Sequence, residues 1–138
     1  MVAISVAPER YSHQLIQETK KFVVNISSID ILSETLLCGR TTGRKNDKFA
    51  EAKLTPSPAK LVKPPIVNEC TAHLECRLSH QIMTGDHTLF VGTVFAAYAN
   101  EGVFKEGKFD STLIRPILHL GGDDFMTLHP KIITPKAN

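Results

Sequence analysis

Two consecutive stretches in the second half of the chain predict a long β-hairpin, and this pairing restricts the fold more than any other feature. From Cys70 to Leu78, cysteine or apolar residues occupy the even positions and polar residues the odd ones, which predicts a strand with one buried and one polar face. Thr84 to His87 has the composition of a turn. Thr88 to Ala99 is almost entirely apolar, which predicts a strand buried on both faces. Such a hairpin is typical of a small barrel, or of a sheet that a partner subunit covers.

Further strands are predicted at Val2 to Ala7, Phe22 to Ile26 and Leu113 to Leu120, the last of them ending in two glycines. Four prolines between Pro56 and Pro65 indicate an extended, loop-rich crossing. Many strands with few helices predict a mainly-β fold of the α+β class.

Three helices are expected in the first half of the chain. Ser12 is a suitable N-cap for a helix that runs to about Lys21. Apolar spacing predicts a second helix from Ile29 to Leu37, with Gly39 as its C-cap. Asn46 or Asp47 is expected to cap a short third helix.

Length and charge narrow the class of protein. The 138 residues predict a single domain over positions 1–138, and a formal net charge of +2 with scattered basic residues argues against a nucleic-acid partner. No apolar run has membrane-spanning length, and the opening from Met1 to Ala7 lacks the basic region and cleavage site of a signal peptide. Three cysteines leave at least one unpaired, which favours a reducing cytoplasm.

The stretch from Cys38 to Phe49 carries the strongest indication of function. It combines two glycines, two adjacent threonine hydroxyls and several cations ahead of a predicted helix. Glycines allow a backbone to approach a ligand, and hydroxyls, amides and a helix start suit a phosphate group. The stretch lacks the ending of a Walker loop. A phosphate-bearing ligand and an ordinary basic surface loop are equally compatible with these residues.

The other candidate residues favour structural roles. Cys70, His73, Cys76 and His80 have a spacing that resembles a zinc site, but strand parity places the cysteines and His73 on opposite faces, so buried structural cysteines fit better.

Structural roles are also favoured for four further side chains. His119 in an apolar strand end is interpreted as a core histidine. Cys38 is interpreted as a packing residue rather than an activated thiol. Asp86 and His87 are interpreted as an exposed turn pair. No serine has the setting of a nucleophile, which points to a cofactor for any demanding chemistry.

At these residues the sequence resembles the flavin reductase-like family with the FMN-binding split barrel, on its flavoredoxin side. The matching segments occur in the family's order over nearly the whole chain. They are Met1 to His13, Lys21 to Ile26, Cys38-Gly39 to Gly43-Arg44, Asp47 to Phe49, Glu69-Cys70, Leu74 to Cys76, Thr84 to Gly92, Arg115-Pro116 and His119 to Gly122.

The resemblance implies a split β-barrel homodimer that binds FMN near the subunit interface and passes electrons onward. A nicotinamide cofactor or a redox protein would be the electron donor. By position, Thr41, Thr42 and Lys48 would hold the phosphate, and Arg40, Gly43 and Arg44 would shape its loop. The remaining implied cofactor-binding residues are Ser5, Asn25, Cys38 and Gly39, near the flavin or its ribityl chain, and His119 from the C-terminal strand.

The chain departs from the family pattern at two positions, where Ser27 replaces a usual proline and Thr42 a usual serine. Family members normally have one or two strands before the segment that matches Met1, so the resemblance implies that N-terminal strands of the barrel are missing. An N-terminally shortened, non-catalytic oligomer or a phosphate-ligand binding module is therefore the alternative function.

The predicted strand from Thr88 to Ala99 also suggests assembly. Alternation places one apolar set on each face, and a shortened barrel has too little material to cover both, so a C2 homodimer is expected. The two sets are Phe90, Val94 and Ala96, and Leu89, Val91, Phe95 and Ala97.

Overall fold

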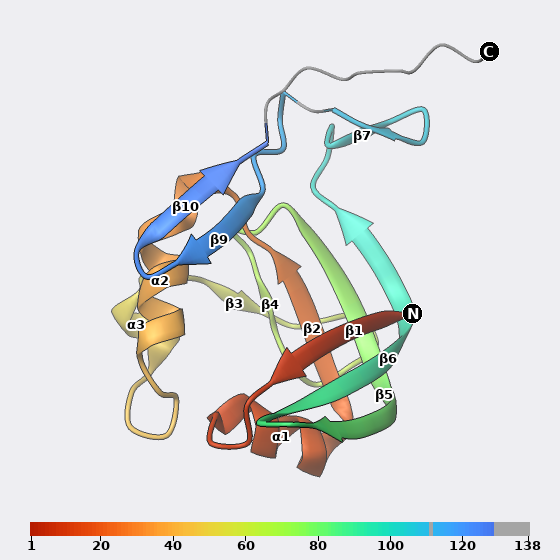
Figure 1. The fold of residues 1–138 in the computed structure, drawn as a ribbon. Coiled ribbons are helices and arrows are strands. Elements are labelled where there is room, and N and C mark those ends of the chain that lie inside the picture. The colour runs from red at the N-terminus through yellow and green to blue at the C-terminus, as the bar shows by residue number, and fades with distance from the viewer. Residues whose placement is uncertain (111, 129–138) are drawn as a thin grey trace, which may run out of the picture.

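A curled antiparallel sheet dominates the computed structural model, which describes residues 1–110 and 112–128 (Figure 1). Its strands are β1 (Val2–Val6), β2 (Lys21–Ile26), β5 (Ala72–Thr84) and β6 (His87–Ala99), in the order β1-β6-β5-β2. Every neighbouring pair is antiparallel. The prediction of a mainly-β fold with a few short helices is confirmed.

The predicted hairpin exists as β5 and β6, and both strands are longer than predicted. Thr84 pairs with His87, and Gly85 turns the chain with a φ of +61°, a conformation that glycine adopts without steric cost. A bulge lies where Glu75 pairs with Ala96 and Cys76 with Val94, so the alternation along β6 changes at the intervening Phe95.

Two expectations about β6 are wrong. Ala96 pairs with Glu75 and Ala97 pairs with Leu74, so each lies on the face opposite to the one expected for it. The strand is also not buried on both faces within one chain, because Phe90 is 0% exposed whereas Phe95 is 49% exposed.

The core lies on one face of the sheet, where Phe22, Cys76 and Phe90 pack against Ile16 of the first helix. Gly92 of β6 faces Phe22, and a Cβ at this position would lie 2.6 Å from the Phe22 ring. The absence of a side chain at Gly92 therefore makes room for an aromatic core residue.

The opposite face of β5 corrects a second expectation. His73 and Glu75, at the odd positions expected to be polar and solvent-facing, are 3% and 0% exposed. The segment at residues 60–62 covers Glu75, since its backbone amides donate hydrogen bonds to the Glu75 carboxylate, and His73 packs against Asn25 and the Tyr98 ring. The period of the strand was predicted correctly, but both faces are buried at this end of β5.

The helices begin and end at different residues from those predicted. Helix α1 (Tyr11–Thr19) has Arg10 at its N-cap, so Ser12 lies inside the helix and the prediction of a Ser12 cap is wrong. Lys20 ends α1 in a left-handed conformation with a φ of 55°.

The second helical segment is longer than predicted. A 3₁₀ turn, η1 (Ile29–Ile31), leads into α2 (Leu32–Arg40), and Thr41 is the C-cap. Gly39 is therefore helical and does not have a positive φ, so its predicted C-cap role is wrong. Helix α3 (Lys48–Glu51) is capped as predicted by Asp47, whose carboxylate accepts from the amides of Phe49 and Ala50.

Three small hairpins complete the described chain. They pair β3 (Pro56–Ser57) with β4 (Ile66–Val67), β7 (Phe104–Lys105) with β8 (Lys108–Phe109), and β9 (Ile117–Gly121) with β10 (Asp124–Thr127). The predicted strand from Leu113 thus begins four residues late. The β9–β10 hairpin lies beside α2 (Figure 1), where Arg40 forms an ion pair with Asp123.

Candidate functional site

A cavity of about 620 Å³ lies between the start of α1 and the segment that follows α2. Six of the predicted cofactor-binding residues line it: Cys38, Gly39, Thr41, Thr42, Gly43 and Lys48. The α1 side contributes residues that the sequence interpretation did not include: Glu9, Arg10, Tyr11, Ser12 and Leu15. The lining therefore carries two cations, one carboxylate and several hydroxyls, a composition suited to an anionic ligand.

Lys48 bridges the two helices that flank this cavity. Its Nζ donates a 2.5 Å hydrogen bond to the carbonyl oxygen of Cys38 in the last turn of α2, where a cation is favoured by the helix dipole. The Asp47 cap fixes the start of α3 and thereby the backbone that carries Lys48. An ammonium group has three donors, so this bond leaves Lys48 able to donate to a ligand in the cavity.

The two adjacent threonines differ in what their hydroxyls do. Thr41 Oγ1 donates to the Leu37 carbonyl at 2.9 Å, and the Thr41 amide donates to the same oxygen at 3.0 Å, so Thr41 terminates α2. Thr42 Oγ1 accepts a long 3.4 Å bond from the Arg44 amide, and its side chain is exposed. Accepting from an amide leaves the Thr42 hydroxyl proton available for a ligand, whereas the Thr41 proton is already engaged.

Gly43 lies against the aromatic ring of Tyr11 rather than in an unusual backbone conformation. A Cβ at Gly43 would approach Tyr11 Cδ1 to 3.3 Å, and Gly43 has no positive φ. The Arg44 guanidinium stacks over the same ring, with its Cζ 4.8 Å from the ring centroid. The glycine therefore brings the loop into contact with α1, which closes one side of the cavity.

Cys38 has no sign of thiol activation. Burial raises the pKa of its thiol, an effect that the nearby Lys48 ammonium opposes and Glu34 reinforces. Burial likewise raises the pKa of Cys70 to about 11 and raises that of Cys76. These directions agree with the interpretation of all three as packing residues, since the reactive form of cysteine is the thiolate.

A second, mainly apolar cavity of about 640 Å³ adjoins the first and shares Ser12 and Leu15 with it. Side chains of β1, β2 and α1 line it, together with the segment at residues 63–65. Asn25 lines it as well, but its Oδ1 already accepts from the Val67 amide at 3.0 Å and lies 2.8 Å from His73 Nδ1. Because Oδ1 is an acceptor, His73 carries its proton on Nδ1. Burial lowers the pKa of His73, although Glu75 opposes this shift.

Four predicted cofactor-binding residues, Ser5, Arg40, Arg44 and His119, line neither cavity. Ser5 is exposed on the face of β1 opposite to Ile4 and Val6, which line the apolar cavity. Arg40 pairs with Asp123 in the turn of the β9–β10 hairpin. The interpretation of His119 as a core residue is wrong, because it is exposed on β9, where its ring stacks on Phe125 at 4.7 Å.

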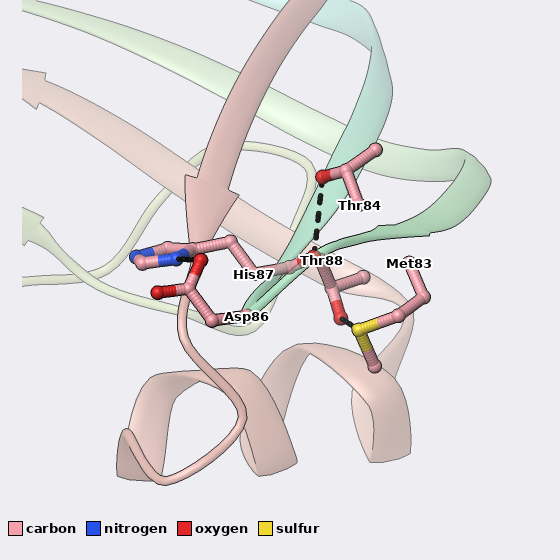
Figure 2. A network of polar contacts seen from close by, with 5 residues as sticks. All are labelled: Met83, Thr84, Asp86, His87 and Thr88. Atoms are coloured by element: carbon pink, nitrogen blue, oxygen red, sulfur yellow. Dashed lines mark hydrogen bonds and ion pairs between the residues drawn. The ribbon is translucent and has the colours of Figure 1, made fainter.

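The Asp86–His87 pair lies at the tip of the β5–β6 hairpin, as the exposed turn interpretation predicted (Figure 2). Asp86 Oδ1 is 2.8 Å from His87 Nδ1, and the Asp86 side chain is 94% exposed. The hydrogen bond to His87 lowers the pKa of Asp86. Thr84 Oγ1 donates to the His87 carbonyl, and Thr88 Oγ1 contacts Met83 Sδ at 3.7 Å, so this network stabilises the turn (Figure 2).

Within residues 1–110 and 112–128, no group of three or more histidine, cysteine or acidic side chains is arranged to hold a metal ion. His73 and Cys76 lie on opposite faces of β5, as strand parity predicted. None of the helices in this described part is long and apolar enough to cross a membrane.

The α1 side of the basic cavity is the part of the site that sequence interpretation missed. Residues 9–12 lie about 30 positions away from the Thr41–Lys48 loop, and only the tertiary fold brings them together. One local signal for this part of the site was present in the sequence. Arg10 lies directly before a helix start, whose backbone amides favour a bound anion, and a cation beside them adds to this preference.

The chain is similar in sequence and in fold to several known proteins. An uncharacterized protein from Archaeoglobus fulgidus is 38% identical over 110 residues, which are 80% of this chain but 62% of that protein, so this chain spans less than two-thirds of its length. The flavoredoxin of Methanosarcina acetivorans is 27% identical with a TM-score of 0.85, and the match covers 96% of this chain and 70% of the flavoredoxin. The flavoredoxin of Desulfovibrio vulgaris (Miyazaki F) is 25% identical, also with a TM-score of 0.85, over 96% and 73% of the two chains.

A protein of Shewanella frigidimarina with a split barrel domain is 18% identical with a TM-score of 0.85, over 98% of this chain and 70% of that chain, and this likeness confirms the predicted split-barrel fold. The model of the flavin reductase like domain matches residues 1–124. The chain therefore belongs to the flavin reductase-like domain family.

Proposed function

We propose that this chain is an FMN-binding flavoprotein that takes part in flavin reduction or in flavin-mediated electron transfer. The observation that carries this proposal is the cavity that joins the Thr41–Lys48 loop to the start of α1. Membership of the flavin reductase-like family supports a flavin-related redox role, and the flavoredoxin neighbours favour FMN as the flavin.

The phosphate of FMN would lie in the basic cavity. Lys48 supplies a cation, and Thr42 supplies an uncommitted hydroxyl proton. No side-chain hydrogen bond caps the start of α1 within the described residues, and Arg10 adds a second cation there. Amides at a helix start and nearby cations together favour a bound anion.

The isoalloxazine ring would extend toward the apolar cavity, which shares the lining residues Ser12 and Leu15 with the basic one. A polar region next to an apolar region matches a ligand with a phosphate at one end and an aromatic ring at the other. When bound, the flavin supplies the redox chemistry, with a nicotinamide cofactor or a redox protein as donor. The residues of this chain bind and orient it.

The proposal extends to a homodimer in the cytoplasm. Several large apolar side chains are about half exposed in the single chain, which is unusual for an isolated domain. They are Phe95, Phe104, Phe109, Leu113, Leu118, Leu120 and Met126. Sedimentation at micromolar concentration should give twice the chain mass, and a monomer would contradict this extension.

A visible spectrum tests the proposed function directly. The purified chain, mixed with FMN and separated from free flavin, should retain a flavin absorption band. Bleaching of that band by NADH or NADPH alone would identify a reductase, and bleaching only after a reduced redox protein is added would identify an electron carrier. The absence of a bound-flavin band in excess FMN would overturn the proposal.

A further inference from the structure

Glu75 is a buried carboxylate that the proposed flavin chemistry does not use. Its Oε1 accepts from the Lys60 amide at 2.8 Å, and its Oε2 accepts from the amides of Leu61 at 2.6 Å and Val62 at 3.1 Å. The Tyr98 hydroxyl donates to Oε1 at 2.9 Å. Four donors thus converge on one side chain that is 0% exposed.

The segment held by Glu75 leads directly into a wall of the apolar cavity. Lys63, Pro64 and Pro65 follow the three bound amides and line that cavity opposite side chains of β2. Beyond the prolines, Asn25 Oδ1 accepts from the Val67 amide. Residues 60–67 are therefore attached to the sheet at both ends, by Glu75 on β5 and by Asn25 on β2.

We propose that Glu75 is a positioning residue: by binding three consecutive amides, it fixes residues 60–65 as the wall of the apolar cavity and thereby sets ligand affinity there. The identity of that ligand as the flavin ring rests on the proposed function. Ordering a loop on binding costs affinity, so a wall that is fixed before binding increases it.

The surroundings of Glu75 keep the carboxylate ionised. Burial alone raises its pKa, but the hydrogen bonds from the three amides and Tyr98 outweigh burial and lower the pKa below its usual value of 4.5. Burial and the bond to Glu75 raise the pKa of Tyr98 to about 12, so the phenol remains a donor.

Three titratable or charged side chains lie around this carboxylate. Tyr98 is bonded to it, and the Lys60 ammonium lies 4.2 Å from the centroid of the Tyr98 ring. The centroid of the His73 ring is 5.3 Å from that of the Tyr98 ring, and the charge of Glu75 opposes the lowering of the His73 pKa.

Glu75→Gln tests the proposal, with Glu69→Gln as the matched control. Glu69 also accepts a hydrogen bond from a backbone amide, that of Thr55. This bond lies at the start of the proline-rich segment, and Glu69 lines neither cavity. Glu75→Gln should weaken binding of riboflavin and FMN by the same factor, about three- to tenfold, because one or two loop residues must then be ordered on binding. It should also speed hydrogen exchange of the amides at residues 60–62. Glu69→Gln should change neither.

The pH profile separates positioning from a general loss of stability. Riboflavin affinity of the native chain should fall as the pH is lowered through the Glu75 pKa, and the Glu75→Gln variant should lack this fall. Tyr98→Phe removes a hydrogen bond to the ionised carboxylate, which raises the Glu75 pKa and should move the fall to higher pH. This variant also decides the case if Glu75→Gln does not fold.

Two results would overturn the proposal: a folded Glu75→Gln variant with native exchange at residues 60–62 and native riboflavin affinity, or a Tyr98→Phe profile that coincides with the native one. If the native chain binds neither FMN nor riboflavin, the proposed function fails, whereas hydrogen exchange at residues 60–62 still decides whether Glu75 holds the wall.

Discussion

Two regions of this molecule gather hydrogen-bond donors that suit an anion, and they differ in whether the chain itself supplies that anion. At Glu75, three backbone amides and the Tyr98 hydroxyl surround a carboxylate of the chain itself, out of contact with solvent. At the basic cavity, Lys48 and the Thr42 hydroxyl lie beside the start of α1 around a volume of about 620 Å³. The first arrangement is saturated by the fold, and the second is available to a ligand.

This difference predicts different consequences for mutation. Removing the internal anion leaves several buried donors unpaired, so the cost falls on stability. Removing a donor at the cavity leaves exposed groups that water can hydrogen-bond, so ligand affinity falls while the free energy of unfolding changes little.

The largest effect is expected from Glu75→Ala. Truncation leaves three amides and one phenol without their acceptor, and we expect the free energy of unfolding to fall by about 3–5 kcal/mol. Urea denaturation measures this change. Glu69→Ala should cost about 1 kcal/mol or less, because its carboxylate is near solvent. Equal losses in the two variants would remove the distinction between the regions.

Acid should weaken the internal site selectively. The folded pKa of Glu75 is lowered, so its contribution to stability is full above its unfolded pKa near 4.5 and is lost as the pH falls through the folded value. The stability difference between the native chain and Glu75→Gln should therefore shrink on acidification. Urea denaturation series at several pH values measure it, and a difference that stayed constant or grew would contradict the assignment.

The adjacent threonines should separate the two kinds of cost. Thr41→Val removes the hydrogen bond to the Leu37 carbonyl and should lower stability by about 0.5–1.5 kcal/mol, with little change in FMN affinity. Thr42→Val should leave stability unchanged and weaken FMN binding about three- to tenfold. Thermal unfolding and FMN titration of both variants give the comparison, and an exchange of the two outcomes would reverse the assigned roles.

The smallest expected effect concerns Gly39. This residue is helical, and a Cβ there would have no neighbour within 4 Å, so Gly39→Ala should stabilise the chain by about 0.5–1 kcal/mol. Thermal unfolding measures the gain. A loss of FMN affinity in this variant would instead indicate that the ligand approaches the Gly39 backbone.

Local sequence signals predicted much of the fold, but they did not predict which segments cover each face of the sheet. The Asp47 cap, the turn at Gly85 and the period of β5 depend on neighbouring residues, and the structure confirms them. The burial of Glu75 depends on a segment 13 to 15 residues away, and nothing in the alternation of β5 distinguishes a solvated face from a covered one.

The site shows the same limit. The Thr41–Lys48 loop was recognisable because its glycines, hydroxyls and cations are contiguous. The contribution of Arg10 and Ser12 depends on how α1 packs near Gly43, which Tyr11 mediates. The resemblance implied that His119 approaches the site from the C-terminal strand, yet that strand forms a separate hairpin with β10, and His119 lines neither cavity.

The central claim is that the basic cavity binds the phosphate of FMN, and Lys48→Ala tests it most directly. Lys45→Ala is the control, because Lys45 is an exposed cation of the same loop that does not line the cavity. Losing a charge-assisted hydrogen bond costs about 1.5–3 kcal/mol, so calorimetric titration should show FMN binding to Lys48→Ala weakened about ten- to a hundredfold. Riboflavin, which lacks the phosphate, should bind the native chain and both variants equally. The account would be contradicted if Lys48→Ala weakened riboflavin binding as much as FMN binding, or if it weakened the binding of neither ligand.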